Sequence, residues 1–234
     1  MSQLFRIAID GPAASGKSTT AKQLAKLFKF RYIDSGAMFR AVTVHCMEEQ
    51  VDVQDQAKVG QLAQSLAIEF PSLGQVSVNG KDVTSQVRQA SVTRLISPVA
   101  SNPLVRQALK QQQQHMASSV DARYPGFPFE GRTVQGVVMD GRDIGTVVLP
   151  QAELKVFLIA DLQARAQRRY QEQQKESLDQ IMRDIEARDL ADRTRSISPL
   201  KKAIDAVELD TSFLSIDQQV ATIQQWVYQK LQQQ

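Results

Sequence analysis

The segment from Leu4 to Ser18 places the strongest constraint on what this chain can fold into. An apolar, partly β-branched run from Leu4 to Ile9 stops at Asp10-Gly11-Pro12, which predicts a buried strand that ends in a turn. From Lys17 onward, apolar residues recur at helical spacing and no helix breaker interrupts them. A strand, a glycine-containing turn and a helix in succession form the first unit of an α/β fold. We therefore expect a parallel sheet covered by helices.

The turn has the spacing Gly11-x-x-x-x-Gly16-Lys17-Ser18. The two glycines let the backbone turn tightly and approach a phosphate, and N–H groups at a helix N-terminus favour an anion. Lys17 supplies a compact cation for the β- and γ-phosphates, and the Ser18 hydroxyl can ligate Mg²⁺. The sequence thus predicts that ATP is bound by Gly11, Pro12, Ala13, Ala14, Ser15, Gly16, Lys17, Ser18 and Thr19.

A second apolar strand, Val137 to Asp140, ends in a carboxylate. Many strands end in this way, so Asp140 alone indicates little. Beside a phosphate-binding loop, however, such a carboxylate typically holds Mg²⁺ or its water. We expect Ser18 to be a ligand of Mg²⁺, and Asp140 to contribute through a water molecule.

Composition excludes several classes of protein. A net charge of +3, from 28 Lys and Arg against 25 Asp and Glu, gives no basic footprint for nucleic acid. The single cysteine, Cys46, excludes an internal disulfide and favours a reducing compartment. No signal peptide and no apolar run of membrane-spanning length is found. No repeated apolar stripe indicates an oligomer, so we expect a cytoplasmic monomer that binds neither nucleic acid nor membrane.

The pattern along the rest of the chain predicts further strands and helices. Strands are expected at Phe30–Ile33, Gly136–Asp140, Leu154–Ile159 and Ala206–Leu209, with a small antiparallel hairpin around Asn79-Gly80, a strong turn signal. Helices are expected at about 37–49, 103–120, 162–175, 178–192 and 216–231, and residues 121–135 are expected to form a loop. Trp226 is expected to anchor the last helix to the core, and Cys46 to be a buried apolar side chain.

The phosphate-binding loop is shared by kinases, GTPases, motor ATPases and inactive binders, so the second substrate needs separate evidence. A GTPase would carry Asn-Lys-x-Asp, which this sequence lacks, and a motor ATPase usually needs a larger core. Arginines recur in three later segments that also contain carboxylates: 34–40, 141–145 and 188–195. Any one of them could belong to a solvated helix face, but arginine suits bidentate phosphate binding, which a kinase with two anionic substrates requires.

These segments also carry a specific resemblance. Residues 7–18, 33–37, 140–148, 198–200 and 210–216 follow, in the same order, motifs of the bacterial cytidylate kinases, and they cover almost the whole chain. The resemblance implies an α/β fold with a parallel five-stranded core, an antiparallel acceptor-binding insert and a helical lid. It also implies transfer of the γ-phosphoryl group of ATP to CMP or dCMP. A kinase for another acceptor such as UMP, or a nucleotide-binding protein without turnover, remains an alternative.

The resemblance also implies roles for individual residues. Arg40, Arg142 and Arg195 look like ligands of the acceptor phosphate and, with Lys17, the catalytic groups. The expected acceptor-binding set is Ser35, Phe39, Arg40, Ser97, Arg106, Arg142, Asp143, Arg188, Asp192 and Arg195. Within it, Ser97, Arg106 and Asp143 resemble the cytosine readers, and Arg188 and Asp192 resemble the pair that holds the ribose. Phe39 departs from the family, which usually has tyrosine there.

The resemblance divides the single domain into three parts. We expect a core at about 1–60, 100–160 and 200–234, an acceptor-binding insert at about 61–99, and a lid at about 161–195. On closure of the lid, arginines such as Arg165, Arg168 or Arg169 could reach ATP. The segment 115–135 is longer than the family's usual connection, and a surface excursion is the expectation.

Overall fold

The computed structural model describes residues 4–173 and 177–233. Within them, five strands form one sheet in the order β10-β9-β1-β8-β2. Their bounds are β1 Phe5–Asp10, β2 Arg31–Asp34, β8 Gly136–Gly141, β9 Leu154–Ile159 and β10 Val207–Asp210. The pairings of β1 with β8, β1 with β9 and β9 with β10 are parallel. The expected α/β fold with a parallel core is confirmed.

Contacts divide the chain into two compact units, which we describe separately. Unit 1 comprises Met1–Phe30 and Ala122–Gln234, and unit 2 comprises Arg31–Asp121. In unit 1, strands β1, β8 and β9 are almost completely buried, as their near-continuous apolar runs require of parallel strands that are covered on both faces.

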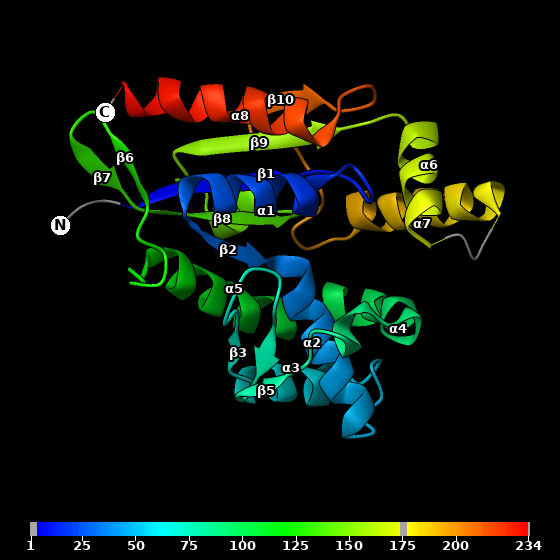
Figure 1. The fold of residues 1–234 in the computed structure, drawn as a ribbon. Helices are drawn as coiled ribbons and strands as arrows, with labels where there is room; N and C mark the ends of the chain where they lie inside the picture. The colour runs from blue at the N-terminus through cyan, green and yellow to red at the C-terminus, as the bar shows by residue number, and fades with distance from the viewer. Residues whose placement is uncertain (1–3, 174–176, 234) are drawn as a thin grey trace. The chain divides into compact units, whose positions relative to one another are not determined.

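The helices of unit 1 form two groups (Figure 1). Helices α1 (Lys17–Phe28) and α8 (Ile216–Leu231) pack on each other and on the sheet. Helices α6 (Leu162–Gln173) and α7 (Leu178–Thr194) pack together beyond the end of the sheet at which β1 stops. Because parallel strands present their carboxyl ends at one edge, this second group of helices lies beside the loop that follows β1.

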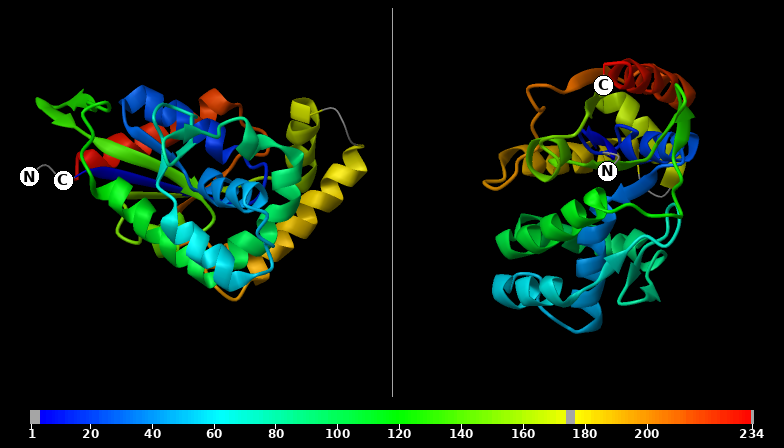
Figure 2. Two further views of the ribbon diagram at one scale, coloured as in Figure 1. Left: turned by 90° about the horizontal axis from the view of Figure 1, so that it is seen from below. Right: turned by 90° about the vertical axis from the view of Figure 1, so that its left-hand side faces the viewer.

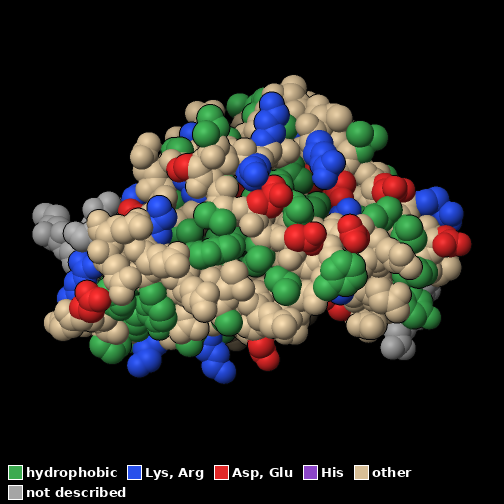
Figure 3. Space-filling view, turned by 90° about the horizontal axis from the view of Figure 1, so that it is seen from above, with side chains coloured by type: hydrophobic (Ala, Val, Ile, Leu, Met, Phe, Trp, Pro, Cys, Tyr) green, Lys and Arg blue, Asp and Glu red, His purple; other side chains and the backbone are tan. Residues whose placement is uncertain are grey.

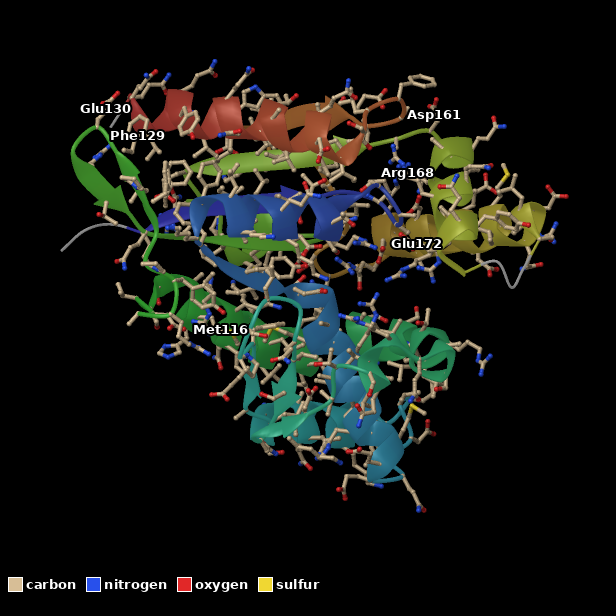
Figure 4. The ribbon with its side chains drawn as sticks, in the orientation of Figure 1. Met116, Phe129, Glu130, Asp161, Arg168 and Glu172 are labelled. Carbon is tan, nitrogen blue, oxygen red and sulfur yellow. The ribbon has the colours of Figure 1, made fainter. Side chains whose placement is uncertain are left out.

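The expectation that 121–135 forms a surface loop is wrong for residues 127–134. Strands β6 (Phe127–Phe129) and β7 (Arg132–Val134) form an antiparallel hairpin, whose tip carries Phe129 and Glu130 in Figure 4. Figure 1 and the left view of Figure 2 place it at the end of unit 1 opposite to α7. The Phe127 ring lies 4.8 Å from that of Phe28, and Phe129 stacks on Tyr228 at 5.8 Å. The hairpin therefore buries aromatic surface between the ends of α1 and α8.

Helix α8 packs on the core through a stripe of buried apolar residues. Its capping box, formed by Ser215 and Gln218, fixes the start of the helix. The residues that face the core are Ile223, Val227 and Leu231, whereas Trp226 is only half-buried. Trp226 lies beside this apolar stripe at four-residue spacing, and its role as an anchor stays a prediction. On the face of unit 1 that carries α8, acidic and basic side chains are interspersed (Figure 3).

Unit 2 is mainly helical. Besides β2, its elements are α2 (Ser35–Glu48), α3 (Gln56–Ser65), β3 (Ile68–Glu69), β4 (Ser77–Val78), β5 (Lys81–Asp82), a 3₁₀ turn Gln86–Arg88, α4 (Ala90–Ser101) and α5 (Pro103–Ser118). The expected hairpin is present: Asn79 and Gly80 both have positive φ, at 50° and 80°, and join β4 to β5. Asp34 caps α2 by accepting the Ala37 N–H at 2.8 Å.

No helix in the described part of the chain is both long and apolar enough to cross a membrane.

Candidate active site

The loop after β1 has the backbone of an anion-binding turn. Gly11 has φ 152°, and a Cβ there would lie 2.2 Å from the Leu158 carbonyl oxygen, so only glycine fits. Gly16, with φ 90°, precedes α1, and Ala14 also has positive φ. Helix α1 has no side chain that caps its first N–H groups. Its N-terminus is therefore suited to bind an anion.

Lys17 is almost completely buried inside this loop. Its ammonium donates to the Pro12 carbonyl and, at 3.3 Å, to Ser15 Oγ. Burial holds the pKa of Lys17 well below its ordinary value, and the positive charges of Arg142 and Arg188 lower the pKa further, while Asp140 and Asp10 oppose them. The two arginines, expected on the acceptor side, thus lie close enough to act on the lysine expected on the donor side.

Ser18 and Asp140 meet as the sequence predicts. The Ser18 hydroxyl donates to Asp140 Oδ2 at 2.7 Å, and Asp140 is 3% exposed at the end of β8. No group of three or more His, Cys, Asp or Glu side chains within 4–173 and 177–233 forms a metal cage by itself. One hydroxyl and one carboxylate do fit Mg²⁺, which keeps several waters and takes further oxygens from substrate phosphates.

Asp10 holds the segment after β8 in place. Its carboxylate accepts the Ile144 N–H at 2.8 Å and the Gly145 N–H at 2.7 Å. Burial raises the pKa of Asp10 to about 6, against the two hydrogen bonds, which lower it. Asp10 thereby fixes the chain just beyond Arg142 and Asp143, two of the expected acceptor-binding residues.

The raised pKa of Asp10 predicts a pH dependence of stability. Unfolded Asp10 takes up its proton near its ordinary pKa of 3.8, whereas folded Asp10 takes it up near 6. This group therefore stabilises the fold more as pH falls from 7 to 5, by about 1 kcal/mol. Urea unfolding of the wild type and of Asp10→Asn at both pH values should show the wild-type advantage growing by that amount. A constant or shrinking advantage would mean that folded Asp10 stays ionised at pH 5.

Arginines and carboxylates form a network between the end of β8 and the end of α7. Arg142 Nε donates to Asp192 Oδ2 at 2.7 Å, and Arg195 Nη1 donates to Asp192 Oδ1 at 3.5 Å. Arg195 Nη2 also lies 3.8 Å from Asp143 Oδ1. Burial raises the pKa of Asp192, but the charges of Arg142, Arg188 and Arg195 outweigh that effect and hold it below its ordinary value. Five of the expected acceptor-binding residues therefore lie close together in unit 1.

The other expected acceptor-binding residues belong to unit 2. Ser35 is buried in the first turn of α2, and a Cβ at Gly36 would lie 3.5 Å from Arg40 Nη1. The Arg106 guanidinium lies 5.3 Å from the centre of the Phe39 ring, and its Nη1 donates to the Ala100 carbonyl at 2.9 Å. Ser97 is exposed on α4, one turn before Ala100. Within unit 2 the structure thus brings Phe39 and Arg106 together.

Asp189 was not among the site residues predicted from the sequence. This carboxylate is 6% exposed, accepts the Ala13 N–H at 2.9 Å and pairs with Arg165. A signal was available, because Ile181, Ile185 and Asp189 follow one another at four-residue spacing and share the buried face of α7. A carboxylate that continues an apolar stripe needs a buried partner.

Two of the lid arginines are engaged with protein groups. Arg165 pairs with Asp189, and Arg168, labelled on α6 in Figure 4, donates to the carbonyl and, at 3.2 Å, to the Oγ1 of Thr211. Burial lowers the pKa of Arg168 from its ordinary value. Arg168 therefore holds α6 to the segment that follows β10.

Comparison with known proteins agrees with this geometry. The family model described as cytidylate kinase matches residues 7–229. A cytidylate kinase of Listeria monocytogenes is 46% identical over 93% of both chains. Those of Listeria innocua and Bacillus cytotoxicus are 45% and 43% identical, each over 99% of this chain and all of the relative. With its phosphate-binding loop, its Ser18–Asp140 pair and its arginine network, this chain belongs to the cytidylate kinase family.

Proposed function

We propose that the residues assembled around Lys17 and Asp192 carry out the reaction of this family, transfer of the γ-phosphoryl group of ATP to CMP or dCMP. As a cytidylate kinase, the chain is an ATP-dependent phosphotransferase. One observation supports the assignment most strongly: the buried Lys17 lies in the loop after β1, and Arg142, at the end of the neighbouring strand β8, pairs with Asp192 of α7. Cationic groups for two anionic substrates are thus gathered in one place.

On the donor side, the phosphate-binding loop from Gly11 to Thr19 would hold the phosphates of ATP. The Lys17 ammonium donates to Pro12 and Ser15, which keeps it inside the loop. Burial and the neighbouring arginines lower the pKa of Lys17, and bound phosphates would favour its charged form. Because the site is buried, each such interaction is stronger than it would be in water.

Ser18 and Asp140 would hold Mg²⁺ at this loop. Both offer hard oxygen atoms, and their 2.7 Å hydrogen bond keeps the two side by side. When bound, the ion would neutralise negative charge on the phosphates of ATP.

On the acceptor side, Arg142 and Arg195, together with Arg40, would bind the phosphate of CMP. The Asp192 carboxylate that now pairs with Arg142 and Arg195 would then accept from the ribose hydroxyls, beside Arg188. The acceptor phosphate is already ionised at neutral pH, so attack on the γ-phosphorus needs positioning and charge stabilisation more than a general base.

The cytosine would be read by Asp143, Ser97 and Arg106. Cytosine presents an exocyclic amine, which a carboxylate accepts, and ring acceptors, which arginine and a hydroxyl satisfy. Phe39 lacks the hydroxyl of the family's tyrosine, but its ring packs against the Arg106 guanidinium. We infer that Phe39 orients Arg106, and that Ser35 shapes the same end of α2.

Removing the Asp143 carboxylate should affect the acceptor alone. In Asp143→Ala we expect the KM for CMP to rise about 10- to 100-fold, the usual cost of a lost charged hydrogen bond, and the KM for ATP to change less than about threefold. Steady-state kinetics with each substrate varied in turn measures both values. Glu186→Ala, on an exposed position of α7, is the matched control. Equal losses for CMP and ATP would exclude the base-reading role.

We also propose a monomer that works in the reducing cytoplasm. Cys46 is fully buried, and burial raises the pKa of its thiol to about 11, so that it stays protonated and unreactive. Light scattering during size-exclusion chromatography should give a mass near 26.1 kDa, and twice that mass would contradict the monomer.

A further inference from the structure

The lid helices contact the phosphate-binding loop through a buried group of three residues, Ala13, Arg165 and Asp189. Ala13 donates its N–H to Asp189 Oδ1 at 2.9 Å, and its carbonyl accepts from Arg165 Nη1 at 3.1 Å. Arg165 and Asp189 also pair with each other, and Arg165 Nε donates to the Ala160 carbonyl at 3.0 Å. Both hydrogen-bonding groups of the Ala13 backbone are therefore bound by side chains of α6 and α7.

This group is buried as well as charged. Ala13 packs in an apolar cluster with Ala166, Ile181 and Ile185. Arg165 and Asp189 are 7% and 6% exposed. A buried ion pair is weak evidence for stability by itself, because desolvation offsets much of the attraction. Its remaining hydrogen bonds here go mainly to Ala13, which indicates a role in fixing the geometry of the loop.

The helix that carries Asp189 also carries the acceptor-side residues. Arg188 precedes Asp189, Asp192 lies one turn later, and Arg195 follows the end of α7. Apolar packing alone is non-directional and tolerates sliding of a helix. The bond from Ala13 to Asp189 is directional, so it fixes both the rotation and the height of α7 relative to the loop.

We propose that Asp189 is a positioning residue of the phosphotransfer reaction: by fastening α7 to Ala13, it holds Arg188, Asp192 and Arg195 in register with the donor loop. This inference rests on the proposed function of those three residues. Asp189 touches neither substrate in this account. Its effect is on the mutual placement of donor and acceptor groups, to which the rate of in-line transfer is sensitive.

The kinetic test compares two substitutions of similar size. Asp189→Leu removes the acceptor for the Ala13 N–H, and we expect kcat to fall about 10- to 30-fold, with both KM values within about threefold of the wild type. Asp189→Asn keeps an acceptor oxygen, and we expect kcat within about threefold. Asp184→Asn, on an exposed position of the same helix, is the control. A kcat for Asp189→Leu within threefold of the wild type overturns the proposal, as does an equal loss in Asp189→Asn.

A second readout does not depend on activity. Hydrogen exchange of the Ala13 amide, followed by NMR without substrate, should become at least about tenfold faster in Asp189→Leu than in the wild type, because that N–H loses its acceptor. Unchanged exchange overturns the anchor. If the wild type itself failed to phosphorylate CMP, faster exchange would still support the anchor while the proposed function failed.

Folding of Asp189→Leu is a separate concern, since it leaves the Arg165 guanidinium buried beside an apolar side chain. The double variant Arg165→Leu, Asp189→Leu removes both buried charges together. It also lacks both side-chain contacts to Ala13, so the same loss of kcat and the same faster exchange are expected. A folded double variant with wild-type kcat overturns the proposal.

Discussion

Replacing Lys17 by alanine is expected to lower kcat/KM by about 1,000-fold or more. Lys17 is the cation inside the phosphate-binding loop, and phosphoryl transfer depends on charge stabilisation by groups of this kind. Its burial removes the screening that would weaken the effect in water. The measurement is the initial rate of ADP formation with CMP over a range of ATP concentrations.

The matched control for Lys17 is Lys26→Ala. Lys26 is an exposed lysine on the same helix, so its removal tests whether loss of any positive charge from α1 matters. We expect Lys26→Ala to keep wild-type rates. Both variants should unfold cooperatively near the wild-type temperature. A Lys17→Ala protein that retained turnover within tenfold of the wild type would contradict the donor-site assignment.

Replacing Arg195 by alanine is expected to lower kcat/KM for CMP by about 100- to 1,000-fold, with the affinity for ATP changed much less. The guanidinium donates to the Ser198 carbonyl at 2.6 Å and lies beside both Asp192 and Asp143, which holds it in a fixed orientation. An oriented arginine is worth most in the transition state, where charge spreads over the transferred group. Kinetics with CMP varied at saturating ATP measures the effect.

Arg193→Ala provides the control for Arg195. Arg193 is an exposed arginine on the last turn of α7, whereas the side chain of Arg195 is largely buried beside Asp143 and Asp192. We expect the Arg193 variant to keep wild-type kinetics. If the two variants lost activity equally, the general positive charge of α7 would explain the result, and the assignment of Arg195 to the acceptor phosphate would be wrong.

Local signals in the sequence were enough to predict the central part of the donor site. The apolar run before Gly11 and the helical pattern after Lys17 predicted β1 and α1, and the loop between them follows from its glycines. The hairpin at Asn79-Gly80 was likewise predicted from its turn residues. Such signals act over a few residues, so they remain readable without the rest of the fold.

Other features depend on contacts between distant residues and were not predictable in this way. Helices α3 and α4 were not predicted. In the sequence, Gly60 gives no reason to expect a helix. In the structure, Leu104 of α5 packs so closely against α3 that a Cβ at Gly60 would lie 2.5 Å from the Leu104 Cβ. The β6–β7 hairpin is stabilised by Phe28 and Tyr228, each about a hundred residues away along the chain. In the sequence, Asp189 is one of several charged residues on α7. Only the hydrogen bond from the distant Ala13 distinguishes it from them.

Transfer of a phosphoryl group from ATP to cytidylate by this chain can be measured directly. Purified protein should be incubated with ATP, Mg²⁺ and, separately, CMP, dCMP, UMP, AMP or GMP, and the products separated by ion-exchange chromatography. We expect stoichiometric ADP and CDP with CMP, ADP and dCDP with dCMP, and rates at least tenfold lower with AMP and GMP, whose purines differ in size from the cytosine that Asp143, Ser97 and Arg106 would read. Faster turnover of UMP than of CMP, or no diphosphate from any acceptor, would contradict the claim.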